Sequence, residues 1–91
     1  MTQEQLEISP TDSDTIDSPN SVILFNDNIH SFEEVANQLV KAISCSYERG
    51  QEFALEIHTK GKAKVYEGEL IDCLKVSSVL EEIGLHTQIE T

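Results

Sequence analysis

The chain has 91 residues, with 17 acidic and 6 basic side chains and a formal net charge of −11. This length suits one small folded domain, and the negative charge disfavours binding to nucleic acid or to anionic membrane surfaces. The sequence contains no apolar run of about 18 residues, the length that spans a bilayer, and it begins without the basic and apolar segments of a signal peptide. We therefore expect a soluble, cytoplasmic protein that binds neither nucleic acid nor membranes.

Residues 1–19 differ in composition from the rest of the chain. They contain five acidic residues, no Lys or Arg, and both prolines of the protein. A segment of this composition buries too little apolar surface to offset the entropy lost on ordering. We predict that residues 1–19 form a disordered acidic extension and that residues 20–91 form the folded domain.

The folded pattern begins with a short apolar run, Val22–Phe25, which predicts a buried strand. The polar residues Asn26–Asn28 follow, and they suit either a plain turn or a site for a ligand with several hydrogen-bond donors. Ser31 and Glu34 have the spacing of a capping box, and apolar positions within residues 32–43 recur on one helical face. The sequence therefore predicts a helix directly after the polar run.

A second helical pattern begins near Ser46 and ends around His58, with Gly50 as a weakening residue inside it. The alternation in Ala63–Glu67 then predicts a short strand. Because two lysines point to the other side of this alternation, the strand suits the edge of a sheet.

The last third of the chain adds a helix and a strand. A third apolar stripe runs from Leu70 to Ile83, and Gly84 stands at a plausible C-cap position. Leu85–Ile89 then predicts the last strand. The order strand, helix, helix, strand, helix, strand predicts a two-layer α+β fold, with three helices packed on a three-stranded sheet.

Catalytic and metal chemistry receive little support from the sequence. Cys45 and Cys73 lack the close spacing of zinc ligands and are too few for a disulfide framework. Cys73 lies in the third apolar stripe and is expected to be buried, whereas His30 precedes the first helix and is expected to be exposed. A hydrolase that uses Cys73 and His58 would need a nucleophile turn or an oxyanion loop, and the sequence has neither. We expect no enzymatic activity, no metal and no cofactor.

Two segments carry a resemblance to a known family. "VILFNDNIHSFEEV" resembles the "VxLxNDDxxTxxFV"-type opening of the ClpS adaptor family, and "ALEIHTKGKAKVYEG" resembles its "LxVHxxGxAxxxxx" segment. The similarity runs from about residue 21 to residue 90, with both motifs in the family's order. It implies a noncatalytic adaptor that binds proteins with bulky hydrophobic N-terminal residues (N-degrons) and delivers them to a ClpA-like or ClpC-like AAA+ unfoldase.

The resemblance also implies how such an N-terminus is bound. A protein N-terminus is a cation with three N–H donors, so it needs several acceptors in a fixed arrangement. Asn26 and His58 match positions that bond the α-amino group directly, while Asp27 and Asn28 complete the polar part of the site. The residues that match the family's hydrophobic pocket are Phe32, Val35, Ala54, Ile57 and Leu85.

Three substitutions depart from the family pattern and keep a second function open. Asn28 stands where a second Asp is common, and Phe32 and Ala54 stand at two positions that are often Met. A pocket narrowed by Phe32 and enlarged at Ala54 would change the order of preference among first residues. The alternative function is a regulator that docks on the unfoldase and changes its substrate choice without reading N-degrons.

Docking on the unfoldase is also implied by the resemblance alone. Glu69 and Lys75, at the start of the third helix, match the docking region, although ordinary solvated helix charges explain them equally well. Residues 1–19 correspond to the extension that family members use to engage the unfoldase pore.

Overall fold

The computed structural model describes residues 19–91, so the predicted disordered extension lies outside the described residues except for Pro19. The six elements follow the predicted order of an α+β fold. Their bounds are β2 (Asn20–Phe25), α1 (Phe32–Ile43), α2 (Tyr47–Lys60), β3 (Lys62–Gly68), α3 (Leu70–Glu81) and β4 (Thr87–Glu90).

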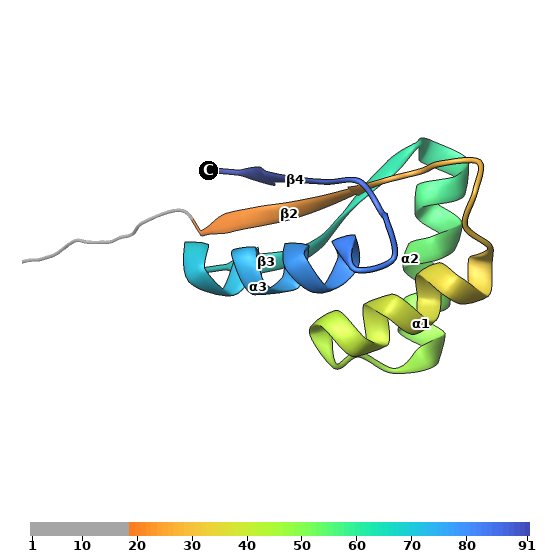
Figure 1. The fold of residues 1–91 in the computed structure, drawn as a ribbon, viewed down its shortest axis with the longest axis horizontal. Coiled ribbons are helices and arrows are strands. Elements are labelled where there is room, and N and C mark those ends of the chain that lie inside the picture. The colour runs from red at the N-terminus through yellow and green to blue at the C-terminus, as the bar shows by residue number, and fades with distance from the viewer. Residues whose placement is uncertain (1–18) are drawn as a thin grey trace, which may run out of the picture.

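The sheet has β2 at its centre, with β3 and β4 pairing antiparallel on its two sides. Lys62 and Lys64 alternate with buried residues along β3 and are exposed, as predicted for an edge strand. Helix α3 lies along one face of the sheet, whereas α1 and α2 gather near the end of β2 (Figure 1). Helix α1 packs mainly on α2 and α3, so it completes the domain without lying flat on the sheet.

The core lies between the sheet and the helices. Cys73 belongs to it and is fully buried, as predicted. The other buried members of this apolar cluster are Val22, Leu24, Leu39, Phe53, Ile57, Ala63, Val65, Val76, Leu80 and Leu85. Each of the larger side chains contributes roughly 1.5–3 kcal/mol through burial. Among residues 19–91, no helix is long and apolar enough to cross a membrane.

Helix α1 begins at the predicted capping box. The Glu34 N–H donates to Ser31 Oγ at 3.1 Å, and the Ser31 N–H donates to the Glu34 carboxylate at 2.8 Å. These two bonds satisfy backbone donors that the first turn leaves without helical partners. The start of α1, and with it the placement of Phe32, is therefore fixed by local sequence.

Helix α2 ends two residues later than predicted. It begins after the cap Ser46 and continues through Lys60 to Gly61, which has a left-handed φ of 90°. Glycine adopts this conformation without the steric cost of a Cβ atom. The extra residues complete the turn that carries His58.

Gly50 has a packing role that the helical pattern did not reveal. A Cβ atom at this position would lie 2.8 Å from the backbone carbonyl oxygen of Ala36. Helix α1 therefore approaches α2 so closely that only glycine fits at this position, although glycine lowers the intrinsic stability of a helix.

The end of the chain is more irregular than predicted. Helix α3 ends at Glu81 and is followed by a turn in which Gly84 has φ 86°. Strand β4 begins at Thr87 rather than Leu85. Leu85 instead buries its side chain in the core, and the His86 carbonyl accepts a hydrogen bond from the Phe25 N–H at 3.0 Å. This irregular link places residues 82–86 beside the end of β2.

Candidate binding site beyond the end of the central strand

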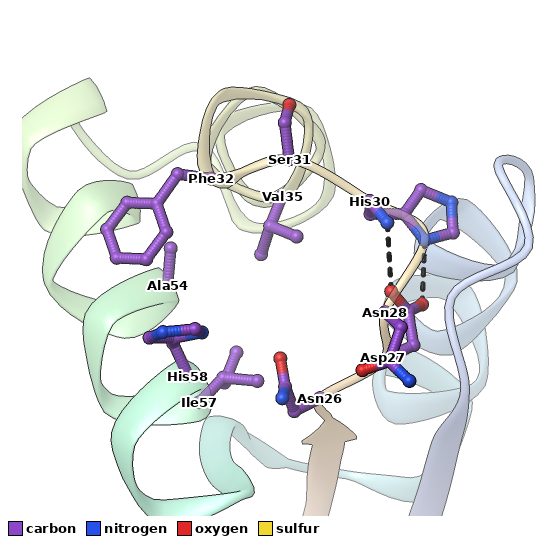
Figure 2. Close-up of a pocket in the computed structure, with 10 residues that line it drawn as sticks. All are labelled: Asn26, Asp27, Asn28, His30, Ser31, Phe32, Val35, Ala54, Ile57 and His58. Carbon is purple, nitrogen blue, oxygen red and sulfur yellow. Dashed lines mark hydrogen bonds and ion pairs between the residues drawn. The ribbon is translucent and has the colours of Figure 1, made fainter.

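A cavity of about 280 Å³ lies where β2 ends (Figure 2). Its lining comes from the loop after β2, the first turn of α1 and the second half of α2. The lining residues are Asn26, Asp27, Asn28, His30, Ser31, Phe32, Val35, Ala54, Ile57 and His58. The structure thus brings together every residue predicted for the amino-group site and every predicted pocket residue except Leu85.

Asn26 is placed by a bond between two distant segments. Its N–H donates to the carbonyl of Gly61 at 2.9 Å, and the N–H of Gly61 donates to the carbonyl of Ile57 at 2.8 Å. The end of β2 is thereby tied to the end of α2, the helix that carries His58. The Asn26 carboxamide points into the cavity, on the side of Ile57 (Figure 2).

Asp27 orders the loop through its carboxylate. One oxygen accepts the N–H groups of Ile29 and His30 at 3.0 and 2.9 Å, and the other lies 2.7 Å from His30 Nδ1. Partial burial raises the pKa of Asp27, but the hydrogen bonds from the His30 and Ile29 backbones and from the His30 ring outweigh it. The pKa is therefore below its usual value of 3.8. Asp27 is thus an anion whose oxygens are already used within the loop.

The prediction that His30 is exposed is wrong: its side chain is only 10% exposed. Its Nδ1 faces Asp27, and its Nε2 lies 2.6 Å from the carbonyl oxygen of Ile83, in the turn after α3. The hydrogen bonds with Asp27 and with this carbonyl raise the pKa of His30 above its usual value of 6.5. Periodicity gives no signal for a contact between residues so far apart in sequence, so the prediction missed it.

The apolar part of the cavity comes from both helices. Ala54 and Ile57 are each 3% exposed, and Val35 points into the cavity (Figure 2). Phe32 remains 41% exposed, and its ring meets the His58 ring edge-on with centroids 5.9 Å apart. The cavity therefore has an apolar floor and a rim of polar acceptors, with Phe32 and His58 side by side.

The other predicted functional residues lie elsewhere. Leu85 is 4% exposed and belongs to the core cluster rather than the cavity lining. Glu69 and Lys75 are exposed at the cap and in the second turn of α3. Burial raises the pKa of the Cys73 thiol, which disfavours the thiolate that a nucleophile needs. Within residues 19–91, no three His, Cys, Asp or Glu side chains gather closely enough to hold a metal ion.

The structure is thus a small α+β domain with a cavity beyond the end of its central strand. A family model described as "ATP-dependent Clp protease adaptor protein ClpS" matches residues 16–87, and the chain belongs to this family. This finding confirms the family predicted from the two sequence motifs.

A solved structure supports the fold independently. The structure of Agrobacterium tumefaciens ClpS2 bound to L-phenylalaninamide has a TM-score of 0.70 and 24% sequence identity, over 80% of this chain and 95% of that chain. Two curated relatives also match. The E3 ubiquitin-protein ligase UBR2 of Homo sapiens is 28% identical over 82 residues, and that of Mus musculus is 31% identical over 58 residues. These matches cover 88% and 64% of this chain, which spans only 5% and 3% of the respective ligases.

Proposed function

We propose that this protein is an adaptor that binds polypeptides with a bulky hydrophobic first residue and a free α-amino group, and delivers them to a ClpA-like or ClpC-like AAA+ unfoldase. The observation that carries the proposal is the cavity, which joins an apolar floor to acceptors at its rim. Family membership supports it. The fold neighbour is bound to L-phenylalaninamide, a ligand with an apolar side chain and a free α-amino group.

The polar rim matches the chemistry of an N-terminal ammonium group. The side-chain oxygen of Asn26 and a neutral ring nitrogen of His58 each accept one N–H, and Asn28 offers a further acceptor. The Asp27 anion provides a favourable charge nearby. Hydrogen bonds to a charged group contribute roughly 1.5–3 kcal/mol each. Acetylation of the amino group would remove both the charge and two of the donors.

The apolar floor sets the preferred first residue. A Leu or Phe side chain buried against Val35, Ala54 and Ile57 would contribute roughly 1.5–3 kcal/mol. After the costs of association, affinities near 1 μM are the expected order of magnitude. A β-branched first residue fits poorly, because its second branch lies beside the α-carbon, where the polar rim approaches the ligand. Because Ala54 is small, the floor leaves room for large aromatic rings.

Docking of the unfoldase is proposed for the start of α3. Leu70, Ile71 and Leu74 are 47%, 57% and 50% exposed there, beside Glu69 and Lys75. An apolar patch with charged neighbours is typical of protein interaction surfaces. The first turn of α3 lies near the start of β2 (Figure 1). The cavity is lined by the loop that follows the other end of β2. Substrate and unfoldase can therefore bind at opposite ends of the domain.

Fluorescence anisotropy with matched peptides tests the proposal. The peptides begin with Leu, Phe, Tyr, Trp, Met or Val and are otherwise identical. We expect affinities near 1 μM for the bulky unbranched residues, and binding of the Val peptide weaker by at least about tenfold. Equal affinity for all six peptides, or no binding of any of them, would contradict an N-degron adaptor. Altered degradation by a purified unfoldase without peptide binding would favour the alternative regulator.

A further inference from the structure

The His30 ring is held between two oxygen acceptors that come from different parts of the fold. Nδ1 lies 2.7 Å from the Asp27 carboxylate and Nε2 lies 2.6 Å from the Ile83 carbonyl. A neutral imidazole has only one N–H, so it can donate to only one of these oxygens. The doubly protonated imidazolium donates to both, and its charge is balanced by Asp27.

The surrounding charges favour the same form. Besides Asp27 in its own loop, Glu34 from the first turn of α1 acts on His30 and raises its pKa. The turn after α3 provides the Ile83 carbonyl, while its carboxylates are engaged elsewhere: Glu82 pairs with Lys41 at 2.8 Å, and Glu81 accepts the Thr87 hydroxyl at 2.9 Å.

This arrangement joins two segments that have no strand pairing or helix packing with each other. Residues 26–31 carry the polar rim of the cavity, and residues 82–84 form the turn after α3. Gly84 lies close to the ring, since a Cβ atom there would be 3.9 Å from His30 Cε1. The loop is thus held at one end by the bond between Asn26 and Gly61, and at the other by His30.

We propose that His30 is a positioning residue for the binding site: its imidazolium ties the loop that carries Asn26 and Asp27 to the turn after α3. This inference rests on the proposed function. His30 acts through Asp27 and the loop backbone and accepts no hydrogen bond from the ligand, because both nitrogens of an imidazolium are donors. Deprotonation of His30 breaks one of its two bonds and leaves the rim less preorganised.

The two histidines of the site then have opposite requirements. His30 must be protonated to hold the loop, whereas His58 must be neutral to accept an N–H from the ligand. A pH profile of the parent protein alone would mix the two effects. The comparison with a His30 variant separates them, because both proteins retain His58.

The decisive experiment measures the affinity of the parent and of His30→Gln for one peptide beginning with Phe, from about pH 5.5 to about pH 9. Glutamine keeps a donor but does not titrate. We expect roughly tenfold weaker binding by His30→Gln at the acidic end, the scale of the ordering costs that a preorganised site avoids. The ratio of the two affinities should approach one at the alkaline end. His86→Gln is the matched control, since His86 contacts the Phe25 ring outside the cavity, and its ratio should stay near one throughout.

A second measurement keeps this inference separate from the proposed function. Nitrogen NMR of the imidazole in the free protein reports whether both His30 nitrogens are protonated. In the parent protein we expect the His30 ring to stay doubly protonated at pH values above its ordinary titration range. In Asp27→Asn we expect it to lose the second proton at a lower pH than in the parent. If the parent binds no peptide, the proposed function fails, and the NMR titration alone then tests the His30 contact.

Two results would overturn the inference. One is an affinity ratio between parent and His30→Gln that stays constant across the pH range, including a ratio of one at every pH. The other is a His30 ring that titrates at its ordinary value and does not respond to Asp27→Asn. Thermal unfolding of each variant at both ends of the pH range establishes that the comparison is made between folded proteins.

Discussion

The two walls of the cavity are built in different ways. The helix wall consists of Phe32, Val35, Ala54, Ile57 and His58, and it is held by the close packing of α1 on α2 at Gly50. The loop wall consists of residues 26–31, which form no helix or strand. It is held by hydrogen bonds to Gly61 and Ile83 and by the pair of Asp27 with His30. Packing is insensitive to pH, whereas the loop wall depends on the charges of two side chains, so different perturbations should disrupt each wall.

The largest effect is expected from a change that separates the two helices. In Gly50→Ala the new methyl group would lie 2.8 Å from the Ala36 carbonyl, so α1 must move away from α2. Overpacking of this kind costs roughly 1–3 kcal/mol, and here we expect this cost to exceed the gain in helix propensity from glycine to alanine. We expect unfolding in urea at a clearly lower midpoint. Gln51→Ala, at the adjacent exposed position, is the control, and equal midpoints for the two variants would contradict the close approach.

The second effect concerns the contribution of the helix wall to the polar rim. His58→Ala removes an acceptor for the ligand's ammonium group, which should weaken binding of a Phe-initiated peptide by about 1.5 kcal/mol, or roughly tenfold. The free energy of unfolding should change little because the side chain is exposed. Titrations of His86→Ala provide the control, and unchanged affinity in His58→Ala would remove His58 from the site.

The third effect tests the floor of the helix wall. Ala54→Met extends a buried side chain into the cavity and should lower the affinity for a Trp-initiated peptide by roughly fivefold relative to a Leu-initiated one. Leu55→Met serves as the control, because Leu55 is 54% exposed on the outer side of α2. If the affinity for the Trp-initiated peptide relative to the Leu-initiated one changes equally in both variants, or in neither, Ala54 does not determine the size preference.

The smaller of the two expected effects on stability comes from the charges of the loop wall. The pKa of His30 is raised, so its contribution to stability is complete below about pH 6.5 and is lost as the pH rises through the raised pKa. The pKa of Asp27 is lowered, so its contribution is complete above about pH 3.8 and is lost as the pH falls through the lowered pKa. The pair therefore stabilises the fold most between these two values.

Urea unfolding of the parent and of Asp27→Asn across this range measures the contribution of the pair. We expect a difference of up to about 1 kcal/mol near pH 5, falling at higher and lower pH. Asn28→Asp, which adds a carboxylate to the same loop, controls for a general charge effect. A difference between parent and Asp27→Asn that does not vary with pH would show that the ion pair contributes nothing.

The same contrast explains how much the sequence could predict. The helix wall follows from periodicity, because apolar residues at helical spacing mark the buried faces of α1 and α2. The capping box fixed the start of α1 from local sequence alone. The polar residues of the site were placed through the resemblance to ClpS, since Asn26–Asn28 by themselves equally suit an ordinary turn.

The features that the sequence did not predict depend on contacts between distant segments. The burial of His30 requires the Ile83 carbonyl, and the reason for Gly50 is the backbone of the neighbouring helix. Leu85 was expected in the pocket but lies in the core, because the irregular link before β4 turns it inward. Local patterns specify the elements, whereas the distances between elements decide which residues reach the cavity.

Recognition of a protein N-terminus is tested by a pair of titrations with one Phe-initiated peptide, first with a free and then with an acetylated α-amino group. We predict binding of the free peptide near 1 μM. Because acetylation removes a charge and leaves acceptors unmatched, it should weaken binding at least about a hundredfold. Equal affinities for the two peptides would contradict the central claim that the cavity recognises a protein N-terminus.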